Sequence, residues 1–285
     1  MQILDGKALA QTIESAIQKE VEILNEQGIT PGLAVILVGN DPASQTYISM
    51  KAKACKRTGI YSITHEMPQS IRQESLLQTI SMLNQNPNID GILVQLPLPK
   101  HIDTAAVLET IAPYKDVDGF HPFNMGRIFS NLDGFIPATP MGVITLLEHY
   151  NIALEGKNVV IIGASNIVGK PLAALFLNKN ATITLCHIYT QDLIKHTKEA
   201  DILCVAVGKP NLITKEMVKE NAIVIDIGIS RLQDGKIVGD VDYPNVSPKC
   251  SFITPVPGGV GPMTIASLLQ NTLKAAKIRY QNIKH

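Results

Sequence analysis

The stretch KNVVIIGASNIVGKP, residues 157–171, decides the fold class of this chain. An apolar run ends at Gly163, a turn follows, and a second glycine, Gly169, opens a helical pattern. In such a strand–turn–helix unit, glycines let backbone amides approach a pyrophosphate at a helix N-terminus. The spacing departs from G-x-G-x-x-G, because Ser165 replaces the second glycine and the next one comes a residue late. The stretch predicts a Rossmann-like dinucleotide-binding domain; the alternative is a glycine that serves only tight helix–strand packing.

Three further strands are expected downstream, at residues 181–186, 201–207 and 222–227. Each is a short apolar run of the kind that buried parallel strands show. Helices are expected in the intervals, with Thr190 and Thr214 as N-caps. This half of the chain therefore predicts an α/β domain with a parallel sheet.

The second of these strands ends at Cys186, His187 and Ile188. No Asp or Glu stands there to accept hydrogen bonds from a ribose 2′-hydroxyl, which favours the 2′-phosphorylated cofactor NADP over NAD. No arginine stands there either, so the preference for NADP is modest.

The first half of the chain also alternates strands and helices. Residues 32–39 form a continuous apolar run, residues 61–67 alternate, and residues 90–96 form a third strand that stops at Pro97. A helix follows the first strand and stops at Gly59. The pattern predicts a second α/β unit with its own parallel sheet.

Two helices of this first half have start signals of their own. Ser70 and Gln73 make a capping box for a helix that runs to about Leu83. Asp103 is expected to cap a short helix that ends near Ile111.

Residues 113–140 are rich in Pro, Gly, Asp and Asn and show no clear periodic element. They predict a loop-rich crossing between domains, followed by a linking helix over residues 141–150. The expected architecture is two α/β domains, residues 1–139 and 140–285, with a cleft between them. The last helix, about residues 262–285, is a segment that can pack back on the first domain.

Composition excludes several classes of protein. Of 285 residues, 45% are hydrophobic and 18% charged, which indicates a globular chain rather than a disordered one. Lys plus Arg equals Asp plus Glu at 25 each, so no basic excess points to nucleic acid. The apolar runs are strand-sized, too short for a membrane span, and no secretory signal pattern opens the chain. Four cysteines without a C-x-x-C pair indicate buried free thiols in a reducing cytoplasm rather than a metal site.

Tyr47 and Lys51 lie four residues apart, so a helix places an aromatic ring beside an ammonium group. That pair suits a flat ligand that undergoes proton transfer, although two ordinary surface residues would have the same spacing. Near the C-terminus, the loop TPVPGGVGPMT, residues 254–264, precedes a helix. It can bring its backbone close to a ligand, or it can be a rigid turn.

Five motifs occur together in one order along the chain. They are YISMK (47–51), GILVQLPLP (91–99), KDVDG (115–119), GASNIVG (163–169) and PVPGGVGPMT (255–264). With these motifs the chain resembles the bifunctional methylenetetrahydrofolate dehydrogenase/methenyltetrahydrofolate cyclohydrolase (FolD) family over nearly its whole length. The last motif is highly specific.

The resemblance implies that folate lies in the cleft between the domains. Tyr47 would stack on it, Lys51 would be the main catalytic group, Gln95 would hydrogen-bond and position that lysine, and Asp118 would hold the donor edge of the pterin. Asp116 has a weaker claim, and a structural role in its turn is favoured. The other substrate-binding residues implied are Val94, Leu96, Pro257, Gly258, Gly259, Val260 and Gly261.

The resemblance also implies a cofactor site in the second domain. Gly163, Ala164 and Ser165 correspond to the phosphate-binding turn, and Ile229 falls where family members contact the nicotinamide half through backbone. Many members carry Ser or Arg at the position of Ile188 and Arg at that of Ala164, so this chain lacks groups that help to hold a 2′-phosphate.

The implied activity is oxidation of methylenetetrahydrofolate with NADP, followed by hydrolysis of the methenyl product to 10-formyltetrahydrofolate. The implied partners are tetrahydrofolate derivatives and a second copy of the chain, while the composition and spacing above indicate no nucleic acid, membrane or metal. A dehydrogenase-only member, a non-catalytic folate or dinucleotide binder, and a generic two-domain dehydrogenase are the alternatives. Three cations on one helix, Lys53, Lys56 and Arg57, either meet a polyglutamate tail or form a solvated face; the solvated face is favoured.

Overall fold

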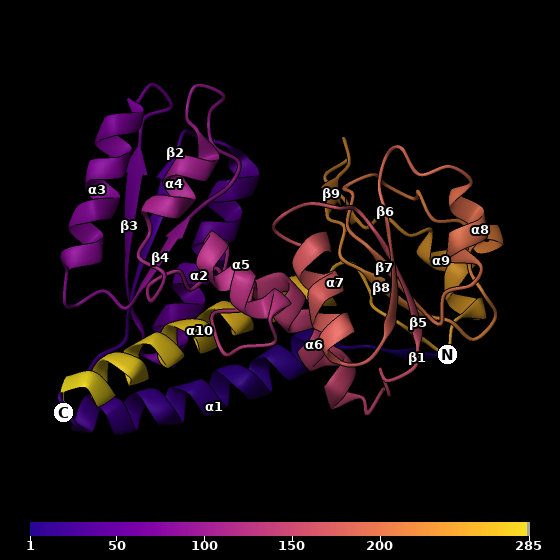
Figure 1. Cartoon of the computed structure of the whole chain (residues 1–285), viewed down its shortest axis with the longest axis horizontal. Coiled ribbons are helices and arrows are strands. Elements are labelled where there is room, and N and C mark those ends of the chain that lie inside the picture. Colours follow the sequence, from indigo (N-terminus) through magenta and orange to yellow (C-terminus); the bar gives the residue numbers. More distant parts are fainter. Residues whose placement is uncertain (284–285) are drawn as a thin grey trace. The chain divides into compact units, whose positions relative to one another are not determined.

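The structure, a computed structural model, describes residues 1–283 and divides into two compact units (Figure 1). The six-stranded unit comprises Met1–Ala10, Ile128–Leu132 and Thr139–Thr264, and the three-stranded unit comprises Gln11–Arg127, Asp133–Ala138 and Ile265–His285. The predicted division at residues 139 and 140 is a single cut in sequence, whereas these units are assembled from separate stretches. Residues 284 and 285, where the last helix and the second domain are predicted to end, lie outside the described residues.

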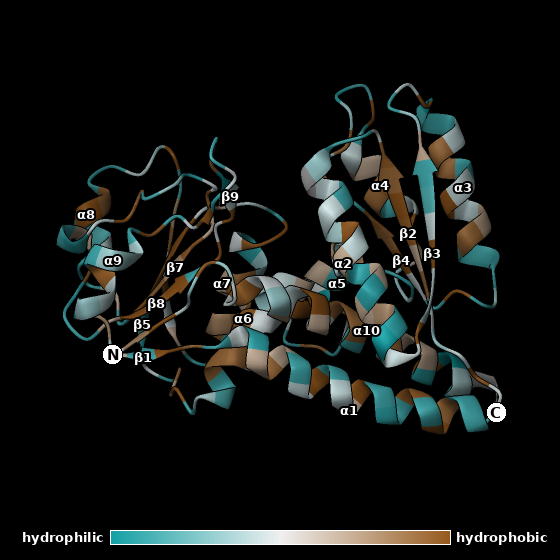
Figure 2. Ribbon diagram, turned by 180° about the vertical axis from the view of Figure 1, so that it is seen from behind, coloured by the Kyte–Doolittle hydropathy of each residue, from teal (hydrophilic) through white to brown (hydrophobic). Residues whose placement is uncertain are grey.

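The three-stranded unit is built on a parallel sheet in the order β3-β2-β4. The strands are β2 (Gly32–Val38), β3 (Tyr61–Met67) and β4 (Gly91–Val94). All seven residues of β2 are buried, as its continuous apolar run predicts, whereas β3 lies at the sheet edge and is partly exposed. Figure 2 shows the same contrast in hydropathy between β2 and β3. The predicted parallel sheet is confirmed.

Helices cover both faces of this sheet. They are α1 (Gly6–Glu26), α2 (Pro42–Thr58), α3 (Gln73–Gln85), α4 (Thr104–Thr110) and α10 (Val260–Ile283). Alternate residues of β2 point to opposite faces: Leu33 packs with residues of α1, α2 and α10, and Ile36 packs with residues of α3 and α4. Along the first face, α1 and α10 run side by side (Figures 1 and 2), joined by an ion pair between Glu20 and Lys277.

The predicted capping box at Ser70 is wrong. Helix α3 has Arg72, two residues after Ser70, at its N-cap, and it has no side-chain cap. Gln73 Oε1 accepts a hydrogen bond from Asp103 N (2.7 Å) instead. The predicted cap at Asp103 is confirmed, since its Oδ1 accepts from Ala105 N at 2.9 Å.

The expectation that residues 113–140 hold no regular element is also wrong. Helix α5 spans Pro122–Phe129, and α6 begins at Ala138 and ends at His149. The start of α5 depends on Asp116, whose carboxylate accepts hydrogen bonds from the turn before it. A periodicity search misses a short helix whose N-terminus is stabilised by a carboxylate several residues away.

The six-stranded unit carries a wholly parallel sheet in the order β1-β11-β8-β7-β5-β6. Its strands are β1 (Gln2–Ile3), β5 (Asn158–Ile162), β6 (Thr182–Cys186), β7 (Ile202–Val205), β8 (Ile223–Asp226) and β11 (Phe252–Ile253). The four longer strands confirm the prediction; β1 and β11 were not predicted, because two residues carry no periodic signal. The remaining elements are α7 (Gly169–Asn178), α8 (Leu193–Thr197), η1 (Lys215–Met217), β9 (Ser230–Arg231), β10 (Ile237–Val238), α9 (Tyr243–Val246) and η2 (Ser247–Lys249).

The strand order places a switch point between β5 and β7. From β5 the chain moves outward to β6 and then returns to the other side of β5 to form β7. In open α/β sheets, ligands bind outside the carboxyl ends of the strands at such a point. In this Rossmann-like arrangement, a ligand is therefore expected at the loops after β5 and β7.

Of the two predicted threonine caps in this unit, Thr190 is wrong, and Thr214 is confirmed in position alone. Thr190 Oγ1 accepts a hydrogen bond from His187 N (2.9 Å), and α8 is capped instead by Asp192. Thr214 precedes η1 without a side-chain cap, and residues 206–222, all of them described, hold this single 3₁₀ turn in place of the expected α-helix. Among the described helices, none is both long and apolar enough to cross a membrane.

Candidate active site and cofactor surface

Helix α2 places Tyr47 and Lys51 on one of its faces. The helix begins after Asp41, whose Oδ2 accepts a hydrogen bond from Ser44 N (2.7 Å), and it ends at Gly59 in the left-handed conformation (φ 76°). Tyr47 is half-buried, and Lys51 is only 7% exposed. Burial to this degree weighs against the alternative of two ordinary surface residues, since lysine is almost never fully buried unless it is paired.

The partner of Lys51 is Gln95, which directly follows β4. Lys51 Nζ donates a hydrogen bond to Gln95 Oε1 at 2.9 Å. The amide of Gln95 is itself fixed, because its Nε2 donates to Leu96 O and its backbone N donates to Ile36 O. The expected hydrogen bond between glutamine and lysine is present; the catalytic roles of the two residues stay predictions.

Burial lowers the pKa of Lys51, and the charges of Asp118 and Cys55 oppose that shift. Burial raises the pKa of Asp118 to about 6, opposed by the charge of Lys51 and reinforced by that of Asp116. The two groups therefore stabilise each other's charged forms while their surroundings disfavour both. An acid with a raised pKa beside a base with a lowered pKa is characteristic of acid–base sites.

The turn that carries Asp118 is held by Asp116. The carboxylate of Asp116 accepts hydrogen bonds from Phe120 N (3.1 Å), His121 N (2.9 Å) and Asn124 Nδ2 (2.8 Å). A carboxylate with three internal donors supports the structural role favoured for it.

Two of the predicted substrate-binding residues flank Gln95. The side chain of Val94 is 2% exposed and lies in the core, so its main chain alone could reach a ligand, whereas Leu96 is partly exposed.

Of the three cations on α2, Lys53 and Lys56 are exposed, and Arg57 forms an ion pair with Glu14 at 2.8 Å.

The loop from Pro257 to Gly261 belongs to the six-stranded unit and leads into α10. Gly258 adopts φ 110°, and a Cβ on Gly259 would lie 2.7 Å from Pro255 O. The glycines thus satisfy tight packing inside the loop, as the rigid-turn alternative requires. Contact of residues 257–261 with a substrate stays a prediction.

The turn after β5 has no room for larger residues at its two glycines. A Cβ on Gly163 (φ 110°) would lie 2.3 Å from Ala206 O, and one on Gly169 would lie 1.7 Å from Gly163 O. Ser165 Oγ, which replaces a glycine of the usual pattern, accepts a hydrogen bond from Val168 N (3.1 Å) before α7. Its hydroxyl hydrogen can still be donated to a phosphate oxygen. The glycines of this turn therefore allow tight backbone packing, and Ser165 can still bind a pyrophosphate.

Apolar side chains are exposed where β6, β7 and β8 end. Ile188 is 91% exposed, Val207 is 40% exposed and Ile229 is 41% exposed. Exposed apolar residues grouped at the carboxyl ends of strands suit the flat rings of a dinucleotide. Val207 is a candidate that sequence reasoning missed, because its run reads as the end of a buried strand.

The structure offers no carboxylate for a ribose 2′-hydroxyl directly after β6. The acid nearest in sequence is Asp192, whose Oδ1 accepts a hydrogen bond from Lys195 N as the cap of α8. Ala164 is partly buried and Ile188 points its side chain into solvent, so neither adds a charge.

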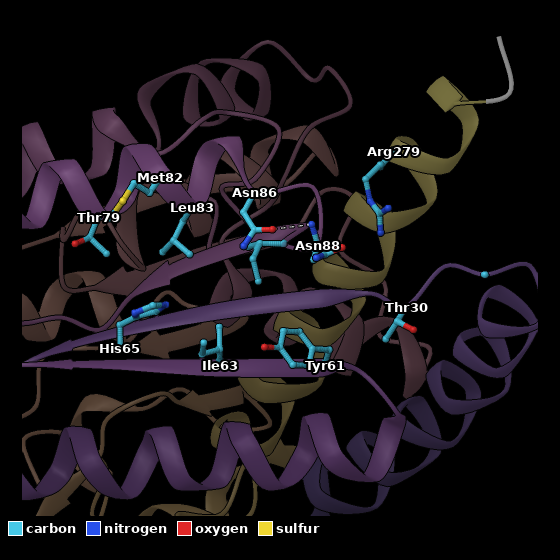
Figure 3. A pocket seen from close by; sticks show the side chains of 12 residues that line it. Thr30, Tyr61, Ile63, His65, Thr79, Met82, Leu83, Asn86, Asn88 and Arg279 are labelled. Carbon is cyan, nitrogen blue, oxygen red and sulfur yellow. Dashed lines mark hydrogen bonds between the residues drawn. The ribbon is translucent and has the colours of Figure 1, made fainter.

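Two surface hollows in the three-stranded unit do not include Lys51 among their lining residues. One, of about 630 Å³, lies beside β3 and is lined in part by Tyr61, Ile63 and His65 (Figure 3). The other, of about 390 Å³, lies by the start of α2, where Gly39, Asp41 and other residues line it. Neither hollow marks the predicted catalytic residues.

Comparison with known proteins covers nearly the whole chain. Residues 4–118 match the catalytic domain of tetrahydrofolate dehydrogenase/cyclohydrolase, and residues 137–280 match the NAD(P)-binding domain of the same family. The bifunctional protein FolD of Wolinella succinogenes is 72% identical over 282 residues, 99% of each chain.

Solved structures agree in fold. The bifunctional FolD enzyme of Campylobacter jejuni is 55% identical, with a TM-score of 0.97 over 98% of this chain and 99% of that one. A methylenetetrahydrofolate dehydrogenase-cyclohydrolase of Trypanosoma brucei, complexed with NADP cofactor and an inhibitor, is 36% identical, with a TM-score of 0.95 over 99% of this chain and 98% of that one.

Proposed function

Because the chain belongs to the tetrahydrofolate dehydrogenase/cyclohydrolase family, we propose that it oxidises 5,10-methylenetetrahydrofolate with NADP and hydrolyses the methenyl product to 10-formyltetrahydrofolate. The observation that carries the proposal is the buried Lys51, held by Gln95 at 2.9 Å and within electrostatic reach of Asp118. Both reactions interconvert one-carbon units on folate.

In the oxidation, the methylene carbon loses a hydride and becomes a cation delocalised over its two nitrogens. NADP, when bound, accepts that hydride. The chain's own contribution is orientation: Tyr47 offers a half-buried ring for stacking, and Asp118 offers two oxygens to the N–H donors of the pterin. Asp118 must be ionised to do so, and a pKa of about 6 leaves it ionised at neutral pH.

In the hydrolysis, water adds to the methenyl carbon and loses a proton. One carbon–nitrogen bond then breaks as the new hydroxyl loses its proton to form the carbonyl, and the released nitrogen gains a proton. The net products are the formyl compound and one proton. Lys51 is the group for these transfers, because burial lowers its pKa and so increases the neutral fraction of an otherwise protonated amine. Gln95 Oε1 accepts from Nζ and so fixes the direction of the amine.

For the cofactor, we propose that Gly163, Ala164 and Ser165 hold the pyrophosphate of the dinucleotide. Ile188 and Ile229 contact the rings of the same cofactor. The narrow turn, the free hydroxyl hydrogen of Ser165 and the exposed apolar side chains support this assignment. NADP is the proposed cofactor because no carboxylate after β6 is available to a ribose 2′-hydroxyl.

One spectrophotometric experiment tests these proposals. With methylenetetrahydrofolate and equal concentrations of NADP or NAD, we expect methenyl formation to be faster with NADP; a faster rate with NAD contradicts the cofactor assignment. Methenyltetrahydrofolate supplied alone should disappear by hydrolysis faster than in buffer. Oxidation without hydrolysis would identify a dehydrogenase-only member, and neither activity would leave a folate or dinucleotide binder.

We also propose that the protein is a cytoplasmic homodimer. Edge strand β3 pairs with β2 on one side alone within the described residues, and its exposed Tyr61 borders the hollow of Figure 3. A long edge strand beside a partly apolar hollow is a surface that pairing with a second copy would cover.

The cytoplasmic location is supported by the four cysteines, which are free and buried, as suits a reducing compartment.

A further inference from the structure

Two buried carboxylates lie at the carboxyl edge of the six-stranded sheet, outside all the residues assigned above. Asp226 is the last residue of β8 and is 3% exposed; Asp240 follows β10 and is 0% exposed. Among the described residues, no cationic side chain forms a hydrogen bond or ion pair with either carboxylate. Both instead accept hydrogen bonds from backbone amides.

Asp226 uses both of its oxygens. Its Oδ1 accepts from Gly228 N (3.0 Å) and Asp240 N (3.0 Å), and its Oδ2 accepts from Val241 N (2.9 Å). The carboxylate thus ties the loop that follows its own strand to the segment that returns after β10.

Asp240 uses one oxygen. Its Oδ2 accepts from Val207 N (2.7 Å) and Gly208 N (3.0 Å), the loop after β7. Its Oδ1 is buried and has no hydrogen-bond partner among the described residues. Together the two side chains join the loop after β7, the loop after β8 and the segment after β10.

Glycines make room for both carboxylates. A Cβ on Gly239 would lie 1.9 Å from Asp226 Oδ2, and a Cβ on Gly228 would lie 2.2 Å from Asp240 Cγ. Bare backbone on both sides lets the carboxylates approach the main chain closely.

This arrangement is costly for the fold. Burial raises the pKa of Asp226 to about 6, against the three hydrogen bonds that lower it, and the charge of Asp240 raises it further. Two like charges in a buried site destabilise each other. A cost of this kind is typical of functional sites.

The loops held in this way carry the exposed apolar residues Val207 and Ile229. The loop after β7 also packs on the glycine turn, since Ala206 O lies 2.3 Å from where a Cβ of Gly163 would be. A shift of that loop would therefore disturb both the apolar surface and the turn.

We propose that Asp226 and Asp240 are positioning residues for the cofactor: they fix the loops after β7 and β8 so that Val207 and Ile229 form a preformed apolar seat for the nicotinamide half. The proposal rests on the function proposed above. Holding the seat in place before binding reduces the ordering cost of the cofactor.

Asp240 accepts hydrogen bonds through Oδ2 and none through Oδ1 among the described residues, and this difference allows a test by substitution. Asp240→Asn can keep its carbonyl oxygen toward Val207 N and Gly208 N, and it removes one of the two like charges of the buried pair, so we expect the KM for NADP to stay within about twofold. Asp240→Ala removes the acceptor, and we expect that KM to rise about tenfold or more. Asp226→Asn cannot satisfy donors on both sides, so it should behave like Asp240→Ala.

Methenyl hydrolysis, which uses no NADP, reports whether each variant is folded. The proposal is overturned if Asp240→Ala leaves the KM for NADP unchanged, if Asp240→Asn is as impaired as Asp240→Ala, or if Asp240→Ala loses hydrolysis and dehydrogenation together. Wild-type protein that neither binds nor reduces NADP would instead overturn the proposed function, so the two failures are distinguishable.

Discussion

At the scale of single residues, Lys51 combines burial with a neutral hydrogen-bond acceptor. Gln95 Oε1 holds its amine at 2.9 Å without contributing a negative charge, so the pKa stays lowered by burial. A carboxylate in place of Gln95 would raise that pKa. An amide therefore orients the amine and leaves its pKa below the ordinary value for lysine.

Lys51→Met is expected to lower methenyl hydrolysis by at least roughly 100-fold, because general acid–base catalysis contributes that order of rate. The matched control is Lys53→Met, which removes an exposed lysine from the same helix and should leave the rate unchanged. Stopped-flow decay of methenyltetrahydrofolate measures both. Equal rates in the two variants would contradict the assignment of Lys51.

Asp118→Asn is expected to stabilise the protein at neutral pH. Because the pKa of Asp118 in the fold, about 6, lies above its value of about 3.9 in an unfolded chain, ionised Asp118 disfavours folding. Wild-type stability should therefore fall, relative to the variant, as pH rises from about 4 to about 6, by roughly 1 kcal/mol after allowance for solvent.

Urea unfolding of both proteins at pH 4 and pH 7.5 measures this difference. A wild-type-minus-variant free energy that is the same at both pH values would show that Asp118 does not titrate in this range. Affinity for methylenetetrahydrofolate should fall in the same variant at pH 7.5, because an amide presents one acceptor where a carboxylate presents two.

At the scale of elements, tight backbone approach defines the turn between β5 and α7. Gly169 has no side-chain space because Gly163 O lies 1.7 Å from the position of its Cβ. Apart from its chain neighbours and the backbone of its own helix, Gly126 in α5 has no atom within 4 Å of its Cβ position. A side chain would therefore clash at position 169, whereas position 126 has room for one.

Gly169→Ala should displace the turn and raise the KM for NADP at least tenfold, with a lowered melting temperature. Gly126→Ala should leave the KM unchanged and stabilise α5 by about 0.5–1 kcal/mol, because alanine loses less backbone entropy than glycine on folding. Thermal unfolding and NADP kinetics on both variants test the pair. An unaffected KM in Gly169→Ala would mean that the turn does not hold the cofactor.

At the scale of the whole molecule, assembly is predicted to depend on the free edge of β3. Tyr61 N bonds to Pro31 O, so the alternation of a parallel strand turns the backbone of Thr64 away from β2. Thr64→Pro therefore removes an outward N–H and leaves the inner ladder intact. We expect this variant to become monomeric.

Light scattering coupled to size-exclusion chromatography measures the mass of each protein. The control is Glu66→Gln, which changes an exposed side chain of the same strand and keeps its N–H. A dimeric Thr64→Pro with wild-type melting temperature would place the interface elsewhere, and a monomeric wild type would refute the homodimer.

The sequence by itself determined what depends on neighbours along the chain. The apolar runs of β2 and β5, the cap at Asp103 and the glycine turn at Gly163 are local signals, and the structure contains each of these elements. The five ordered motifs were also sufficient to indicate the family, which the comparisons confirm.

Only the tertiary structure decided what depends on contacts between distant residues. The burial of Lys51 beside Gln95, 44 residues away, and the bond from Val207 N to Asp240, 33 residues away, have no local signal. The same holds for β1, which pairs with β11 from the other end of the chain. Desolvation and long-range hydrogen bonds change pKa values and fix loops, and folding alone determines which groups lose their water.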